Sequence, residues 1–104
     1  MRRGEVWWAE LPRPIGRRPV VLLSRDEAYA VRNAVTIAEV TTTIRGIPVE
    51  VSLGPEDGLP KNCVANLDTM ATIRKDLLTK RITLLRNEKL RRIDAAIKFA
   101  LSLG

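Results

Sequence analysis

Hydrophobic positions in the first part of the chain fall into short runs, and turn-forming residues separate one run from the next. Gly4–Leu11, Pro19–Ser24 and Val35–Thr41 have the length and the β-branched or aromatic content of strands. Pro12–Gly16 predicts a loop, and Arg25–Arg32 predicts a short helical turn. The pattern therefore predicts three strands with short connections.

The middle of the chain predicts further strands and tighter turns. A glycine and a proline separate Thr41–Arg45 from Val49–Leu53, so we expect these two segments to form a hairpin. Gly54–Pro60 contains too many glycines and prolines to sustain a ladder and predicts a loop. Cys63–Asn66 and Met70–Ile73 are short strand candidates beyond that loop.

The C-terminal part has helical periodicity. Asn87 is a candidate N-cap, and apolar residues follow it at helical spacing: Leu90, Ile93, Ile97, Ala100 and Leu101. Basic residues occupy the other faces, where solvation is their ordinary role: Lys89, Arg91, Arg92 and Lys98. Short strands followed by one helix predict a mainly β protein with a C-terminal helix, built as a small antiparallel barrel in a single domain over residues 1–104.

Composition indicates a class of partner. The chain has 18 Lys and Arg against 12 Asp and Glu, a formal charge of +6, which favours a polyanion, although a solvated basic surface explains the charge as well. No apolar run reaches membrane-spanning length and no signal-peptide pattern follows Met1, so we expect a cytoplasmic protein without membrane contact. The single cysteine, Cys63, excludes an internal disulfide, and we expect no metal and no cofactor.

Groups that bind phosphate well lie at the ends of two predicted strands. Arg17 and Arg18 precede the second strand, and Thr41–Thr43 close the third, so both sets can reach one anion if the strands are neighbours. Strand propensity is the competing explanation of the threonines. The chain has no histidine, so phosphodiester chemistry here would proceed without the usual acid and base at neutral pH.

Several motifs in order along nearly the whole chain resemble the MazF/PemK-like toxins. They are Arg2–Trp8, Arg18–Val21, Val35–Thr42, Arg45–Pro48 with Glu50–Val51, Val64–Asp68, and Thr72–Ile73 before Lys75–Leu77. The resemblance implies an SH3-like barrel of the CcdB/PemK type that forms a homodimer. It also implies a ribosome-independent, metal-independent, sequence-specific endoribonuclease, an mRNA interferase, which is the toxin of a type II toxin–antitoxin system.

The resemblance assigns the catalytic positions to Arg18 and Thr41, with the 2′-hydroxyl of single-stranded RNA as the nucleophile. A guanidinium can stabilise charge that develops on the phosphate, whereas the threonine hydroxyl can donate a hydrogen bond but is too weak for simple proton transfer. The remaining candidates for RNA contact supply cations, hydroxyls or an aromatic ring: Arg17, Ser24, Thr42, Thr43, Arg45 and Tyr29. For Tyr29, a place at the edge of the core is the alternative to stacking on a base.

The sequence departs from the family pattern at positions that bear on chemistry. Pro12–Arg17 contains no carboxylate, where some members have a glutamate, whereas Glu39 stands where a proline is common. Strand alternation places Glu39 on the same side as Thr41. It is either a substitute base or a partner for Arg17 or Arg18, and the frequency of structural ion pairs favours the second. Thr69 and Ala71 replace longer polar side chains that help to hold RNA.

Other classes of function stay open on this sequence. A non-catalytic CcdB-like toxin or binding module would act on a protein partner and would not need Arg18 with Thr41. A plain RNA-binding barrel would bind RNA without cutting it. For the endoribonuclease, we expect a cognate antitoxin whose acidic, flexible segment occupies the basic groove.

Overall fold

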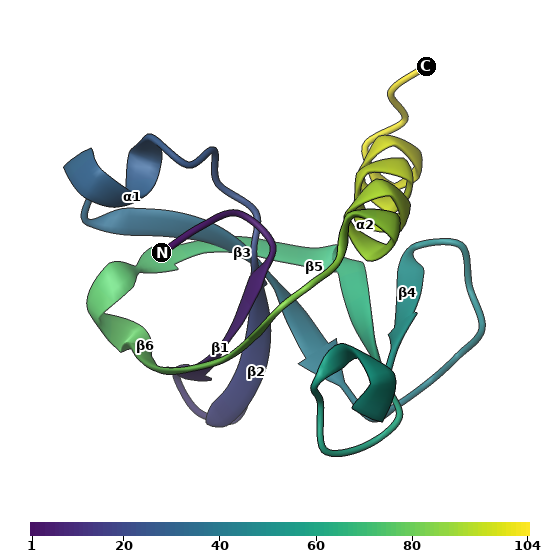
Figure 1. Cartoon of the computed structure of the whole chain (residues 1–104), viewed down its shortest axis with the longest axis horizontal. Coiled ribbons are helices and arrows are strands. Elements are labelled where there is room, and N and C mark those ends of the chain that lie inside the picture. The colour runs from purple at the N-terminus through teal and green to yellow at the C-terminus, as the bar shows by residue number, and fades with distance from the viewer.

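The computed structural model describes all residues 1–104 as one curled antiparallel sheet with a helix packed on it (Figure 1). The strands are β1 (Glu5–Glu10), β2 (Arg17–Leu22), β3 (Ala34–Thr41), β4 (Glu50–Leu53), β5 (Cys63–Arg74) and β6 (Leu78–Leu84). The helices are α1 (Ala28–Val31) and α2 (Asn87–Ala100), and two 3-10 turns cover Pro55–Asp57 and Lys75–Leu77. The mainly β class, the terminal helix and the first three strands are confirmed. No helix is both long and apolar enough to cross a membrane.

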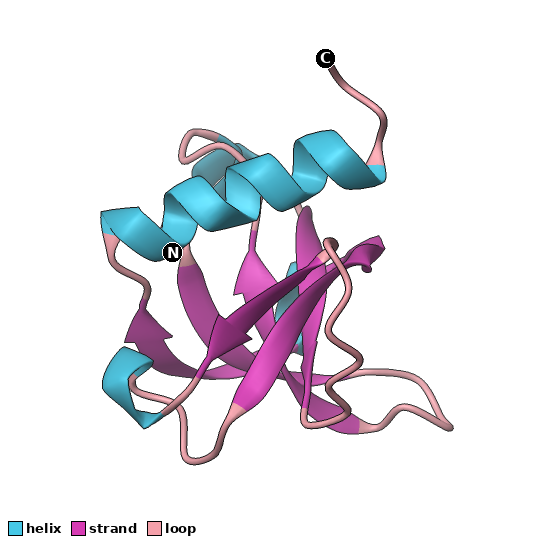
Figure 2. Cartoon of the chain, turned by 90° about the vertical axis from the view of Figure 1, so that its right-hand side faces the viewer, coloured by secondary structure: helices cyan, strands magenta, loops and turns pink.

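The sheet has the order β4-β5-β3-β2-β1-β6, so β4 and β6 are edge strands and the barrel stays open between them. Its two faces bury separate cores. One face packs Val6, Val21 and Ala38 against Ile93 of α2, and Figure 2 shows this helix lying across the sheet. The other face curls around Val20, Leu22 and Ile37. Because side chains alternate along each strand, one strand supplies both cores.

The expected hairpin of Thr41–Arg45 with Val49–Leu53 is wrong. Strand β3 ends at Thr41, and β4 pairs instead with β5, with Val51 opposite Ala65. The reason is that both edges of β3 are already occupied, by β2 on one side and by β5 on the other. Residues 42–48 therefore form an exposed loop.

The two short strands expected after the loop are one long strand. In β5, Met70 pairs with Ala38 and Asn66 pairs with Glu39, so a bulge between them interrupts the register without ending the strand. Strand β6 was not predicted at all. It is an edge strand with exposed polar residues in its middle, and its apolar signal is correspondingly weak.

The start of α2 also corrects two expectations. Arg86 occupies the cap position without a side-chain cap bond, and Asn87 is already helical. Lys89 is buried rather than solvated, because its ammonium donates to the Ser52 carbonyl at 2.6 Å and lies 3.7 Å from Asp57. This lysine ties α2 to the β4 edge of the sheet.

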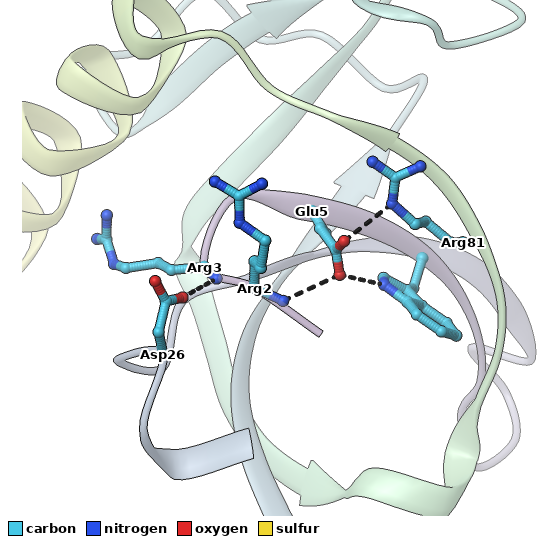
Figure 3. Close-up of polar contacts among 6 residues, drawn as sticks. Arg2, Arg3, Glu5, Asp26 and Arg81 are labelled. Carbon is cyan, nitrogen blue, oxygen red and sulfur yellow. Dashed lines mark hydrogen bonds and ion pairs between the residues drawn. The ribbon is translucent and has the colours of Figure 1, made fainter. Parts of the chain in front are cut away.

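The N-terminal segment is held by a buried carboxylate at the start of β1. Glu5 accepts hydrogen bonds from the Arg2 backbone and the Trp7 indole at 3.0 Å each, and from the Arg81 guanidinium at 2.9 Å (Figure 3). Burial on its own would raise the pKa of Glu5, but these donors together outweigh it, so the pKa lies below its ordinary value of 4.5. Arg3 adds a bond from its backbone to Asp26 at 2.7 Å.

This network predicts an acid-sensitive contribution to stability. A lowered pKa in the folded state stabilises the protein fully above the unfolded-state value of 4.5, and that stability is lost as the pH falls through the folded value. Glu5→Gln should lower the free energy of unfolding by about 1.5–3 kcal/mol at neutral pH. It should also reduce the loss of stability at acid pH, as measured by denaturant unfolding. The exposed Glu10→Gln on the same strand is the control, with an expected change within about 0.5 kcal/mol. Equal losses in the two variants would contradict this account.

Candidate active site

The ends of β2 and β3 bring Arg18 and Thr41 together. The two strands are antiparallel with Val20 opposite Glu39, and extending this register by two residues places Arg18 opposite Thr41. Both side chains line a polar cavity of about 260 Å³. The expectation that the two phosphate-binding ends are neighbours is confirmed, because in an antiparallel pair the start of one strand meets the end of the other.

Arg18 is held in place by Glu39. Its Nη1 donates to Glu39 Oε1 at 2.9 Å, and the side chains are 33% and 16% exposed, respectively. The prediction that Glu39 forms an ion pair with one of the two arginines is therefore confirmed, and the partner is Arg18. Because only part of the guanidinium fork contacts Glu39, its remaining N–H groups are left as donors.

Thr41 is oriented by the loop that follows it. The backbone N–H of Thr43 donates to Thr41 Oγ1 at 3.2 Å, which leaves the hydroxyl hydrogen to donate elsewhere. Glu50 holds the far side of the loop by accepting from the backbone of Arg45 at 3.1 Å and of Gly46 at 2.8 Å. The loop thus brings Thr43 and Arg45 to the same cavity.

Strand β5 supplies two cavity residues. Asn66 had no role in the site expected from the sequence, whereas Thr69 was expected only as a shorter replacement for family side chains that hold RNA. The bulge folds Thr69 back so that its hydroxyl donates to the Asn66 carbonyl at 2.9 Å. Asn66 Oδ1 accepts from the Asp68 backbone at 2.9 Å, so its NH₂ group is left as a donor. The one sequence feature that could have pointed to Asn66 is its position as an amide inside the apolar run Cys63–Leu67.

Two of the residues expected to contact RNA lie elsewhere. Ser24 is at the opposite end of β2, where its hydroxyl accepts from the Thr36 backbone at 2.9 Å. Tyr29 is only 6% exposed and packs in the core beside β2 and β3, so the edge-of-core alternative is the correct one. Burial, with Asp26 nearby, raises the pKa of Tyr29 to about 12.

Arg17 and Thr42 do not line the cavity. The guanidinium of Arg17 stands 4.4 Å from the centre of the Trp8 ring and 3.5 Å from Glu10. Thr42 lines a second cavity together with Trp8. Trp7, on the other face of β1, packs against the core that contains Val20.

The cavity can bind and polarise a phosphate. Its charged donors are Arg18 and Arg45, and its neutral donors are hydroxyls and one amide. Glu39 is its one carboxylate, and therefore the one anionic proton acceptor among the side chains of the lining. The chain contains no group of three histidine, cysteine, aspartate or glutamate side chains placed to hold a metal ion.

A curled antiparallel sheet with one terminal helix and an arginine–threonine cavity at its strand ends is the architecture of a class of small toxins. The chain belongs to the PemK-like, MazF-like toxins of type II toxin–antitoxin systems, whose family model matches residues 2–101.

Individual relatives are similar over the same length. The probable endoribonuclease MazF5 of Mycobacterium tuberculosis is 42% identical over 99 residues, which cover 94% of this chain and 90% of the relative. The solved structure of the Mycobacterium tuberculosis toxin MazF-mt6 superposes with a TM-score of 0.89 at 30% identity and covers 96% of this chain and 98% of its own. A mycobacterial endoribonuclease in complex with its cognate antitoxin has a TM-score of 0.88 at 29% identity, covering 100% of this chain and 97% of its own.

Proposed function

We propose that this chain, an endoribonuclease toxin of a type II toxin–antitoxin system, is an mRNA interferase that cuts single-stranded RNA at short sequences. The nucleophile is the 2′-hydroxyl of the RNA itself. It needs neither a ribosome nor a metal ion and works in the cytoplasm. The observation that carries the proposal is the meeting of Arg18 and Thr41 in one polar cavity. A cavity with a single carboxylate and two arginines offers too little negative charge to hold a divalent cation tightly.

The reaction exchanges one phosphorus–oxygen bond for another. The 2′-oxygen attacks the adjacent phosphorus, the bond to the 5′-oxygen breaks, and the products are a 2′,3′-cyclic phosphate and a 5′-hydroxyl. Negative charge grows on the nonbridging oxygens, where Arg18 and Thr41 donate hydrogen bonds. The leaving 5′-oxygen takes its proton from water.

Glu39 has two successive roles in this proposal. Before RNA binds, its ion pair at 2.9 Å holds the Arg18 fork in the cavity. A bound phosphate competes for that fork and leaves the Glu39 carboxylate free to accept a hydrogen bond from the substrate. It is then the acceptor for the 2′-hydroxyl proton, which it returns to the water that protonates the leaving 5′-oxygen.

The arrangement of the cavity disfavours the binding-module alternative. A CcdB-like module that acts on a protein has no need for an arginine and a threonine converging on an anion-sized polar site. The relatives of this chain are named endoribonucleases. The function therefore rests on the site, since a shared fold alone does not define an activity.

Partners follow from charge and from exposed apolar surface. An antitoxin partner is supported by the solved toxin–antitoxin complexes of relatives, and the net charge of +6 favours an acidic, flexible segment that competes with RNA. Phe99 and Leu101 at the end of α2 are 61% and 56% exposed, and we propose that a second copy covers them in a homodimer.

The proposal is tested by incubating the purified chain with a long unstructured RNA in the presence of EDTA. We expect discrete fragments at an undiminished rate, because the chemistry uses only protein donors and one carboxylate. Light scattering on the same sample should give twice the chain mass. Cleavage that stops in EDTA and returns with one added metal would contradict the proposal, as would RNA that is bound but never cut.

A further inference from the structure

Asn66 lines the phosphate cavity from β5, across β3 from Arg18. Asn66 pairs directly with Glu39, and Glu39 pairs directly with Val20, so these side chains project from the same face of the sheet. Arg18 and Thr41 each lie two residues along their strands from this row and share its face. The cavity therefore has an arginine on one side of β3 and an amide on the other.

The bulge in β5 fixes the orientation of the Asn66 side chain. Its Oδ1 accepts from the Asp68 backbone N–H at 2.9 Å, and its backbone carbonyl accepts from the Thr69 hydroxyl at 2.9 Å. Because a backbone N–H only donates, the side-chain atom that faces it is the oxygen, and the NH₂ group points the other way. The amide is thus held in one orientation before any substrate binds.

The NH₂ group of Asn66 has no hydrogen-bond partner within the protein. The residue is only 9% exposed, and Glu39, which lies directly opposite, bonds Arg18 instead. Buried side-chain atoms that lack both a partner and contact with solvent occur only in Tyr29 and Asp57, so the NH₂ group of Asn66 opens onto the cavity. Since buried polar groups are almost always hydrogen-bonded, two fixed donors left open in a polar cavity indicate a ligand.

We propose that Asn66 is a further catalytic residue, whose NH₂ group donates to a nonbridging oxygen of the scissile phosphate. This inference rests on the function proposed above and deepens it. Strands β2 and β5 each lie about 5 Å from β3, so an anion held over β3 can accept from Arg18 on one side and from Asn66 on the other. Because the amide is neutral and already oriented, it stabilises charge that develops on the phosphate but adds little to the long-range attraction of RNA.

The first test compares two substitutions of Asn66 in single-turnover cleavage of a short RNA with one mapped cut site. Asn66→Ala removes the whole amide, whereas Asn66→Asp keeps an oxygen for the Asp68 backbone and removes the donors. Both should lower the rate about 10²- to 10³-fold, the usual loss for one oxyanion donor, and Asn66→Ala should change the affinity for RNA little. Asn62→Asp makes the same exchange at an exposed position just before β5 and should stay within about twofold of the wild type.

A cycle with phosphorothioate RNA separates contact with the phosphate from a structural role. Sulfur, a weak acceptor, replaces each nonbridging oxygen at the cut site in turn. For the wild-type chain, the sulfur that faces Asn66 should slow cleavage, whereas in Asn66→Ala the same sulfur should cost little further. The other sulfur should keep its wild-type effect. Because each variant is compared with itself, a general loss of stability does not produce this pattern.

The wild-type chain offers a measurement that does not depend on whether the variants fold. Asn33, Asn62, Asn66 and Asn87 are its only side-chain amides, because it has no glutamine. An RNA with a 2′-deoxy residue at the cut site lacks the nucleophile and stays intact. In NMR titrations, this RNA should shift the NH₂ signals of Asn66 more than those of the other three asparagines.

Three results would overturn the assignment. In the first, Asn66→Asp cleaves as the wild type does, which would leave Asn66 only its structural bond to Asp68. In the second, both phosphorothioate effects persist in Asn66→Ala, and a changed pH dependence would then make Asn66 a positioning residue for Glu39. In the third, the bound RNA leaves the NH₂ signals of Asn66 unmoved. Absence of any cleavage by the wild-type chain would refute the proposed function instead.

Discussion

Arg18→Ala should lower the single-turnover rate of RNA cleavage by about 10²- to 10³-fold or more, while the affinity for RNA falls only modestly. One preorganised donor to a developing oxyanion is typically worth that much in rate, and the other arginines still attract the RNA backbone. Arg18→Lys should recover little, because an ammonium cannot reproduce the planar fork that spans Glu39 and a phosphate. Thr41→Val, which keeps the shape and removes the second donor, should lose rate in the same direction.

Matched controls lie at the far ends of the same strands. Arg25→Ala removes an exposed arginine just beyond β2, and Thr36→Val removes a hydroxyl near the start of β3 that bonds only Thr72, at 3.1 Å. Both should leave the cleavage rate within about twofold, since surface changes of this kind cost little. Undiminished cleavage by Arg18→Ala in a folded protein would refute its catalytic assignment and favour the binding-module alternative.

The second large effect is expected at Glu39. A general base contributes about 10²- to 10⁴-fold, and Glu39 is the only carboxylate in the cavity lining. If Glu39 is this base, the wild-type rate should rise with pH and then level off, which is the general behaviour of base catalysis. Glu39→Gln should cut slowly, with no such rise, and should bind RNA at least as well because Arg18 loses a competing anion.

The pH profile separates catalysis from simple ion pairing. If Glu39 only positions Arg18, Glu39→Gln will keep the wild-type pH dependence and will mainly lower the melting temperature, since the arginine loses its partner. Glu88→Gln on the exposed face of α2, where Glu88 pairs with Arg92 at 3.1 Å, controls for the loss of a surface carboxylate. It should change neither the rate nor its pH dependence.

Local sequence signals predicted most of the strands because their apolar residues are buried on one face or on both. They did not predict β6, because an edge strand exposes its middle to water and keeps little hydrophobic signal. They also misplaced the partner of β4, since the choice between β3 and β5 depends on which strand edges remain free in the finished sheet. Long-range pairing of this kind leaves no mark in a short window of sequence.

The candidate site likewise contains residues that the sequence could predict and residues that it could not. The family resemblance singled out Arg18 and Thr41, and strand direction and alternation bring both of them together with Glu39 once β2 and β3 are neighbours. Ser24 was misplaced because a residue at the end of β2 faces the start of β3, the wrong end for the cavity. Asn66 needed the β5 bulge and the pairing with Glu39, neither of which the sequence reveals.

The most direct measurement is the chemistry of the ends that cleavage leaves on RNA. Mass spectrometry of fragments made by the wild-type chain in EDTA should find a 2′,3′-cyclic phosphate on the upstream fragment and a 5′-hydroxyl on the downstream one. These ends follow from attack by the 2′-hydroxyl on a phosphate held by Arg18 and Thr41. A 5′-phosphate with a free 3′-hydroxyl would show that water is the nucleophile and would contradict the proposed mechanism.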